Sequence, residues 1–258
     1  MTDAAPDEPR IRRILVALDA SPQSVEVLRG AALLATGFEA ELCGIFVEDS
    51  ELFDLPGLPF VREVRVVSAR VELLNAEQLA REVRALARRA RRLLEEQALE
   101  AGLRWSFRTV RGRVVHELLS AAQDVDLVTL GGAGFRRLAG RRFGSTAREL
   151  SRRLSRPLLL MHRGDAMHVP VCIVHGATAS ASRALETARR VAAALNGALH
   201  VFPAPEAGAT PRSARSLAAA VGARGAGLLV MAADEPLLEG DGLQALFDEL
   251  RCALLLVR

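Results

Sequence analysis

The sequence contains no lysine, and this absence removes two classes of chemistry. All 34 basic residues are arginine. A Walker-type P-loop needs a lysine on the terminal phosphates of its nucleotide, so that kind of phosphate site is excluded. Schiff-base chemistry, which needs a lysine amine, is excluded for the same reason.

Aromatic residues and long apolar runs are also scarce. Tyrosine is absent and aromatic residues make up 4% of the chain, which argues against recognition of single-stranded nucleic acid by base stacking. No apolar run approaches the roughly 18 residues of a membrane span. Residues 1–9 are acidic and polar, unlike a signal peptide. We therefore expect a cytoplasmic protein that binds neither nucleic acid nor membrane.

The cysteines and histidines show no spacing typical of a metal site. Cys43, Cys172 and Cys252 lie far apart, each in an apolar run, and we expect them to be reduced thiols in the core. The five histidines are scattered. His162 and His168 could meet, but two histidines without nearby carboxylates make a poor zinc site. We predict no metal site built from side chains.

Apolar runs alternate with segments of helical period along the first part of the chain, after residues 1–10, which we interpret as a disordered tail. The 258 residues suffice for one large or two ordinary domains. Strands are predicted at 14–18, 41–47, 105–110, 127–130 and 157–162. Helices are predicted at 24–36, 71–101, 114–122 and 146–154, with Gly37 and Gly102 closing the first two. Residues 61–67 are predicted to be a strand or an extended flap. This alternation indicates a doubly wound parallel sheet.

The same pattern restarts after residue 168. When the two copies are aligned, equivalent positions follow in the same order: Ile14 aligns with Val171, Asp19 with Gly176, Leu28 with Leu185, and Leu42 with Leu199. Segments 228–231, 242–250 and 253–257 mirror the fourth strand, the last helix and the fifth strand of the first copy. We interpret this as two tandem α/β domains, at 11–165 and 168–258. The second is shorter because residues 204–216 replace the flap and the long helix.

The most specific signal is a set of glycines after the strand at 127–130. Gly131, Gly134, Gly144 and Ser145 follow the pattern Gly-x-x-Gly-x9-Gly-Ser between that strand and a helix. Glycines in this place let backbone N–H groups approach a phosphate closely. Ser145 and Thr146 would lie where a helix N-terminus presents unpaired N–H groups. The sequence therefore predicts a cradle for nucleotide phosphates, with a flexible turn as the alternative.

Three features together resemble the universal stress protein family in a tandem arrangement. They are the glycine spacing, Asp19 after the first strand, and the Phe46-Val47-Glu48-Asp49 end of the second strand. The resemblance covers residues 12–163 well and 169–258 weakly. It implies a Rossmann-like five-stranded parallel sheet of order 3-2-1-4-5. A ligand would bind at the carboxyl ends of the strands, where this order reverses.

The resemblance implies an ATP site, with Mg²⁺ as companion ion, made by ten residues. The adenine pocket and the ribose would be contacted by Ala17, Leu18, Asp19 and Val47. The ribose and phosphates would pass over Leu130, Gly131 and Gly134, and the β- and γ-phosphates would accept hydrogen bonds from Gly144, Ser145 and Thr146. For Asp19 the alternative is a helix N-cap. Four arginines lie within the loop, and we expect at most one to reach the ligand: Arg136, Arg137, Arg141 and Arg142.

The second copy lacks these features. Gly176 replaces Asp19, and Ala232-Ala233-Asp234-Glu235 replaces the first glycines. Two acids near a phosphate position disfavour a triphosphate, so we expect this half to keep the fold without binding nucleotide. We expect residues 158–161 and 253–257 to pair as sheet edges, giving an intrachain pseudo-dimer. A homodimer of tandem chains remains open.

Three functions are compatible with the sequence. The first is a cytoplasmic ATP-binding stress-response regulator with an unknown protein partner, whose ATPase activity, if any, is slow because no general base is evident. The second is an adenylating or pyrophosphate-releasing enzyme of related fold. Asp19-Ala20-Ser21-Pro22 speaks against it, because such enzymes carry a Ser-Gly-Gly-x-Asp-Ser loop there. The third is an interaction module that binds acidic partners and no nucleotide.

Overall fold

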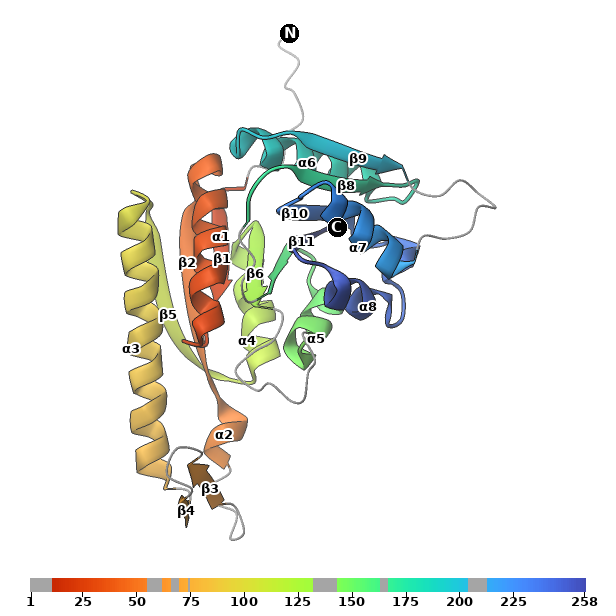
Figure 1. Ribbon diagram of the computed structural model, residues 1–258. Coiled ribbons are helices and arrows are strands. Elements are labelled where there is room, and N and C mark those ends of the chain that lie inside the picture. The colour runs from red at the N-terminus through yellow and green to blue at the C-terminus, as the bar shows by residue number, and fades with distance from the viewer. Residues whose placement is uncertain are drawn as a thin grey trace.

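A single nine-stranded sheet runs through both halves of the molecule in the order β5-β2-β1-β6-β7-β11-β10-β8-β9 (Figure 1). The computed structural model describes residues 11–54, 62–65, 70–73, 75–131, 143–162, 167–203 and 213–258. Among these residues, no helix has the length and apolar character needed to cross a membrane.

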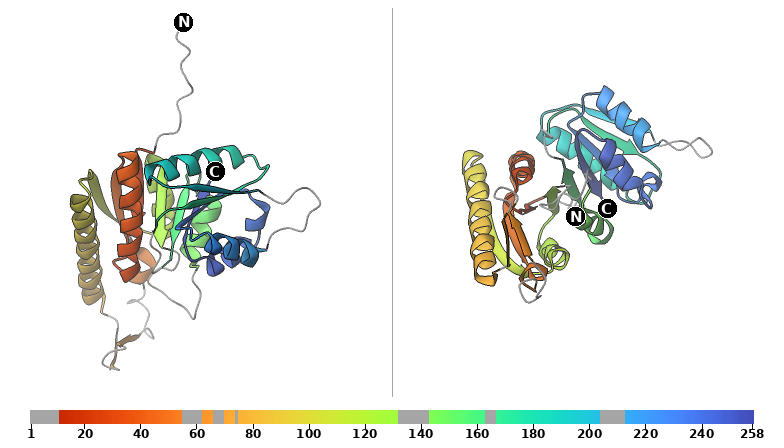
Figure 2. Two further views of the ribbon diagram at one scale, coloured as in Figure 1. Left: turned by 45° about the horizontal axis from the view of Figure 1, so that its top comes forward. Right: turned by 60° about the horizontal axis from the view of Figure 1, so that its bottom comes forward.

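The first half supplies five parallel strands in the order 3-2-1-4-5. In that order they are β5 (Trp105–Gly112), β2 (Glu41–Asp49), β1 (Arg13–Ala17), β6 (Leu127–Gly131) and β7 (Leu158–Met161). Helices α1 (Pro22–Phe38) and α3 (Ala76–Glu100) cover one face of these strands (Figure 2). Helices α4 (Val114–Ala121) and α5 (Ser145–Arg153) cover the other face. The 3₁₀ turn η2 (Ala122–Asp124) follows α4 directly. Burial on both faces explains why β1 and β6 are continuous apolar runs.

The second half repeats this plan with one strand fewer. Its parallel strands are β9 (Leu199–Pro203), β8 (Val171–His175), β10 (Leu228–Ala232) and β11 (Ala253–Val257). Its helices are α6 (Ala181–Ala194), α7 (Ala214–Ala223) and α8 (Gly242–Glu249), with the 3₁₀ turn η3 (Pro236–Leu238) before α8. The described residues of this half contain no counterpart of β5 or α3. The order β9-β8-β10-β11 therefore corresponds to 2-1-4-5, which agrees with the predicted shortened second copy.

The two halves join where β7 pairs with β11, and this junction is called the seam below. The pairing is antiparallel and matches Leu158, Leu159 and Leu160 with Leu256, Leu255 and Leu254. All six side chains are at most 2% exposed. Across the seam, the rings of Phe143 and Phe247 lie 5.3 Å apart between centroids. The strand pairing expected from the sequence is thus present.

The long helix begins later than predicted. It was expected from residue 71, but α3 starts at Ala76, where Asn75 Oδ1 accepts hydrogen bonds from the N–H groups of Glu77 (2.9 Å) and Gln78 (3.2 Å). Before Asn75, β3 (Arg62–Arg65) and β4 (Arg70–Leu73) pair as a two-stranded antiparallel hairpin. This hairpin follows the short helix α2 (Ser50–Asp54) at the end of β2. Helix propensity in 71–73 is overridden by strand pairing, and the Asn75 cap sets the start of the helix.

Gly37 does not close the first helix, contrary to prediction. Helix α1 continues to Phe38, and Glu39 adopts the left-handed conformation (φ 54°) that ends it. Gly37 instead allows a close approach of α6, because a Cβ there would lie 2.6 Å from the Cβ of Ala194. The glycine is required by helix packing between the two halves rather than by a turn.

The seam should be sensitive to the loss of a single buried side chain. We expect Leu255→Ala to lower the free energy of unfolding by about 3 kcal/mol, because it removes buried methyl groups and leaves a cavity. The matched control is Leu99→Ala on α3, where the side chain is 68% exposed. It should change stability by less than about 0.5 kcal/mol. Denaturant unfolding of both variants measures the difference, and similar losses would contradict the importance of the seam.

Candidate functional site

The carboxyl ends of β1, β2 and β6 form the edge at which the strand order reverses. Strand β1 pairs with β2 on one side (Ala17 with Ile45) and with β6 on the other (Val16 with Thr129). The fully buried hydroxyl of Thr129 donates a hydrogen bond of 2.9 Å to the carbonyl of Leu15 and fixes β6 against β1. Ligands of open parallel sheets bind at such an edge.

Six of the ten predicted residues lie at this edge on described strand ends and the turn after β1. They are Ala17, Leu18, Asp19, Val47, Leu130 and Gly131. The N–H of Leu18 is already used, because it donates to the carbonyl of Ile45 at 3.0 Å. Leu18 can therefore offer its carbonyl, but not its N–H, to a ligand, and its side chain is buried in the core at 4% exposure.

Asp19 holds the turn that leads from β1 into α1. Its Oδ1 accepts hydrogen bonds from the N–H of Ser21 (3.0 Å) and from the hydroxyl of Ser24 (2.7 Å). The N-cap of α1 is Ser21, so Asp19 does not take the N-cap position that was the alternative role. Ser24 is 3% exposed and was not singled out from the sequence. A serine five residues after a strand-ending aspartate is the signal that could have indicated it.

The predicted phosphate end lies at the start of α5. Gly144 is its N-cap (φ −80°, ψ 164°), and Ser145 and Thr146 are its first two residues. No side chain caps this end in the described residues, and its first turn contains no acidic residue. The first N–H groups of a helix have no acceptor within the helix, so this end can donate to an anion. Gly134, Arg136, Arg137, Arg141 and Arg142 lie outside the described residues.

A charged pair supports the outer side of this edge, and sequence analysis missed it. Glu48 and Arg111 are register partners on β2 and β5, and Arg111 Nη2 lies 2.9 Å from Glu48 Oε2. The guanidinium also lies over the ring of Phe53 in α2, 4.1 Å from its centroid. Arg113 pairs with Glu51 of α2 at 3.4 Å. The sequence alone does not show which residues of β2 and β5 lie opposite each other, so this pair could not be recognised before the strand register was known.

In the second half, the chain itself occupies the equivalent edge. The Asp234 carboxylate, which follows β10, accepts a hydrogen bond of 3.1 Å from the N–H of Ser180 before α6. At the start of α8, the N–H of Gly242 donates to the carbonyl of Glu239 at 2.8 Å. A Cβ on Gly242 would lie 2.0 Å from the carbonyl oxygen of Leu237. The segment after β10 and the start of α8, which would face the phosphates of a nucleotide, therefore both make contacts within the protein.

Glu235 adds a buried carboxyl to this closed edge. Its side chain is 6% exposed, and its Oε1 has no hydrogen-bond partner among the described residues. Burial raises the pKa of Glu235, and the charge of Asp234 raises it further, while His175 acts in the opposite direction. An ionised carboxylate is costly here because it is buried and its Oε1 has no hydrogen-bond partner among the described residues.

His162, His168 and the three cysteines make packing or backbone contacts, or are buried. His162 stacks on Phe247 with ring centroids 3.7 Å apart, and His168 Nδ1 lies 2.9 Å from the carbonyl of Val169. The three cysteines are free and buried, as predicted. Within the part of the chain that the structure describes, no three potential metal ligands of the His, Cys, Asp and Glu types come together.

The raised pKa of Glu235 predicts how stability depends on pH. Its native pKa lies above the unfolded value, so ionised Glu235 destabilises the protein at high pH and this cost disappears as the pH falls below about 4.5. We expect Glu235→Gln to stabilise the protein by about 1 kcal/mol at about pH 8 and to have no effect near pH 4. Denaturant unfolding at both pH values measures this.

The matched control is Glu239→Gln, which removes an exposed carboxyl from the same loop. Its effect should stay below about 0.5 kcal/mol at both pH values. A gain from Glu235→Gln that is the same at both pH values would contradict the assignment.

Comparisons with known proteins agree with this architecture. A structure of a universal stress protein from Archaeoglobus fulgidus DSM 4304 is 14% identical, with 95% of this chain and 96% of that chain covered and a TM-score of 0.69. A functionally unknown protein from Pseudomonas aeruginosa PAO1 is 14% identical, with 98% and 94% covered and a TM-score of 0.62. Both similarities extend over both halves.

A universal stress protein in complex with cAMP is 22% identical, with 59% of this chain and 98% of that chain covered and a TM-score of 0.40. Among curated proteins, no relative matches the chain. The model of the universal stress protein family matches residues 10–162, more than half of the sequence. This chain therefore belongs to the universal stress protein family.

Proposed function

We propose that this protein is a cytoplasmic regulator in a stress response that binds one ATP per chain in its N-terminal half. The observation that carries the proposal is the position of the two ends of the glycine-spaced segment. One end is Gly131, at the edge where the strand order reverses, and the other is the start of α5, which no side chain of the described residues caps. A phosphate chain placed there meets backbone N–H groups and the positive end of a helix dipole.

The adenosine part would lie over the ends of β1 and β2. The carbonyl of Leu18 and the backbone of Ala17 and Val47 would line the adenine pocket. Asp19 would accept a hydrogen bond from a ribose hydroxyl through Oδ2, because both of the bonds described above go to Oδ1. The Ser24 hydroxyl would act as a positioning group that fixes the orientation of this carboxylate.

The phosphates would pass over Leu130, Gly131 and Gly134 toward Gly144, Ser145 and Thr146. Mg²⁺ is usually held by phosphate oxygens and water with few protein ligands, which suits a site whose donors are mainly backbone groups. The first turn of α5 carries no acidic residue that could activate a water molecule. We therefore propose binding rather than rapid hydrolysis.

We further propose that the second domain, residues 168–258, does not bind nucleotide and serves as a permanent packing partner of the first domain, residues 11–165. The support is the occupied edge, where Asp234 takes the N–H of Ser180 and the η3 turn covers the start of α8. A triphosphate would have to displace these bonds and would meet like charge.

Calorimetric titration with ATP and Mg²⁺ tests the proposed site. We expect one site in the wild type, and we expect Gly131→Val plus Gly144→Val to weaken binding by about tenfold or more, because overpacking at this scale costs about 1–3 kcal/mol. Gly144 has φ −80°, which valine can adopt, so the effect reports on the approach of the ligand. The control is Gly222→Val, where an added Cβ meets no atom within 4 Å.

The other outcomes of this titration separate the alternatives. Two sites per chain would contradict the closed second half. No binding by the wild type would favour an interaction module that uses arginine-rich surfaces. Release of pyrophosphate on adding an acceptor would favour a nucleotide-using enzyme of related fold.

A further inference from the structure

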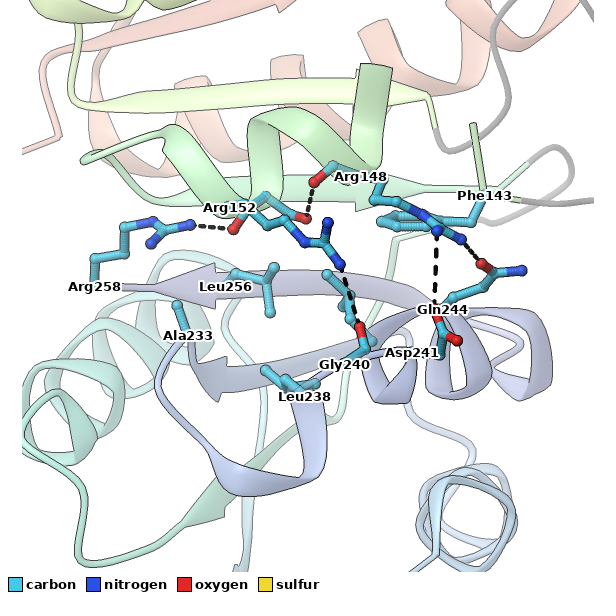
Figure 3. Close-up of a pocket in the computed structure, with 12 residues that line it drawn as sticks. Phe143, Arg148, Arg152, Ala233, Leu238, Gly240, Asp241, Gln244, Leu256 and Arg258 are labelled. Carbon is cyan, nitrogen blue, oxygen red and sulfur yellow. Dashed lines mark hydrogen bonds and ion pairs between the residues drawn. The ribbon is translucent and has the colours of Figure 1, made fainter. Parts of the chain in front are cut away.

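A pocket of about 210 Å³ lies beside the seam, between the two halves (Figure 3). Helix α5 of the first half forms one wall, and the loop into α8 forms the opposite wall. The end of β11 closes the pocket at Leu256 and Arg258. The pocket exists only because the two halves are packed together.

Three arginines face this pocket. Arg148 and Arg152 extend from successive turns of α5, and Arg258 extends from the end of β11 toward the same helix (Figure 3). Among the described residues that line the pocket, Asp241 is the one acidic side chain, and it is 87% exposed, with Oδ1 3.8 Å from Arg148 Nη1. An exposed pair at this distance gives little neutralisation, so the pocket has an excess of positive charge.

The arginines are held mainly by neutral oxygen atoms. Arg258 Nη2 donates to the carbonyl of Ser151, and Arg148 Nη2 donates to Gln244 Oε1. Arg152 Nη2 reaches the carbonyl of Gly240 at 3.5 Å, which is a weak contact. A guanidinium has five N–H donors, so these few bonds orient the three groups and leave donors for a ligand.

Arg258 shows most clearly that an anionic partner would fit. Its Nε is buried and has no hydrogen-bond partner in the described structure. Burial lowers the pKa of this guanidinium, but arginine stays charged in proteins. The residue as a whole is partly exposed, but its buried Nε lacks an acceptor, and an anion in the pocket would supply that acceptor together with a counter-charge.

We propose that this pocket binds a small phosphate-type dianion, held across the seam by Arg148, Arg152 and Arg258. Guanidinium forks match the oxygen geometry of phosphate and bind it with two parallel hydrogen bonds. The volume of about 210 Å³ is below the ~300–1,000 Å³ of pockets that enclose drug-sized ligands. An inorganic phosphate or a single phosphoryl group fits better than a whole nucleotide.

The pocket adjoins the proposed ATP site but has a different lining. The ATP phosphates are assigned to Gly144, Ser145 and Thr146, none of which lines the pocket. The pocket begins beside them at Phe143 and Arg148 and extends to Ser151 and Arg152 toward the other end of α5. Because the anion would contact both halves, its binding should stabilise their packing, as any ligand selective for the native state does. This gives a readout independent of ATP.

The test is titration of the full chain with inorganic phosphate at constant ionic strength, followed by calorimetry and thermal unfolding. We expect one phosphate per chain and a rise in Tm. In Arg152→Gln plus Arg258→Gln the affinity should fall by about tenfold or more, because charge-assisted hydrogen bonds are lost. The single variant Arg152→Gln, at an exposed position, should fold normally and lose part of the affinity.

The matched control is Arg153→Gln, on the same helix but paired with Glu149 at 2.7 Å and outside the pocket. It should bind phosphate as the wild type does. Gly131→Val plus Gly144→Val should also retain phosphate binding; its loss there would assign the ion to the ATP cradle and overturn the proposal. Equal binding by Arg152→Gln and the wild type, or an equal Tm rise with chloride, would overturn it as well.

Discussion

The packing of the two halves against each other depends on the antiparallel pairing of β7 with β11. A parallel sheet must be covered on both faces, and its edge strands expose unpaired backbone groups. Here the last strand of each half pairs with that of the other, and six fully or almost fully buried leucines form the junction. Both hydrophobic cores then continue across it. On one face α1 packs against α6, and on the other Arg148 of α5 bonds to Gln244 of α8. The pocket with the three arginines is a product of the same junction.

The two halves use different contacts at the carboxyl ends of their strands. In the first half, the turn after β1 is organised by Asp19 and Ser24, and no side chain among the described residues caps the start of α5. In the second half, Asp234 bonds to the turn after β8, and η3 folds back over the start of α8. The four strands that both halves share have the same order, so the difference comes from the segments that connect them.

Much of the fold could be predicted because buried parallel strands are continuous apolar runs. The strand predicted at 127–130 is β6, and the glycine spacing placed the candidate phosphate site next to it. The hairpin of β3 and β4 was harder because its strands alternate charged and apolar residues and lie outside the main sheet. Gly37 was misinterpreted because the contact that requires a glycine there is with Ala194, which is distant in sequence. The roles of Arg111 and Arg258 also depend on contacts between distant segments that no local pattern reveals.

The covalent connection between the halves has a consequence for how the protein behaves in the cell. Two separate chains that pair through an edge strand dissociate on dilution and can exchange partners. In this chain the partner is always present at a high effective concentration, so the pairing does not depend on the amount of protein. The first half is then packed against the second half in every molecule, whatever the expression level.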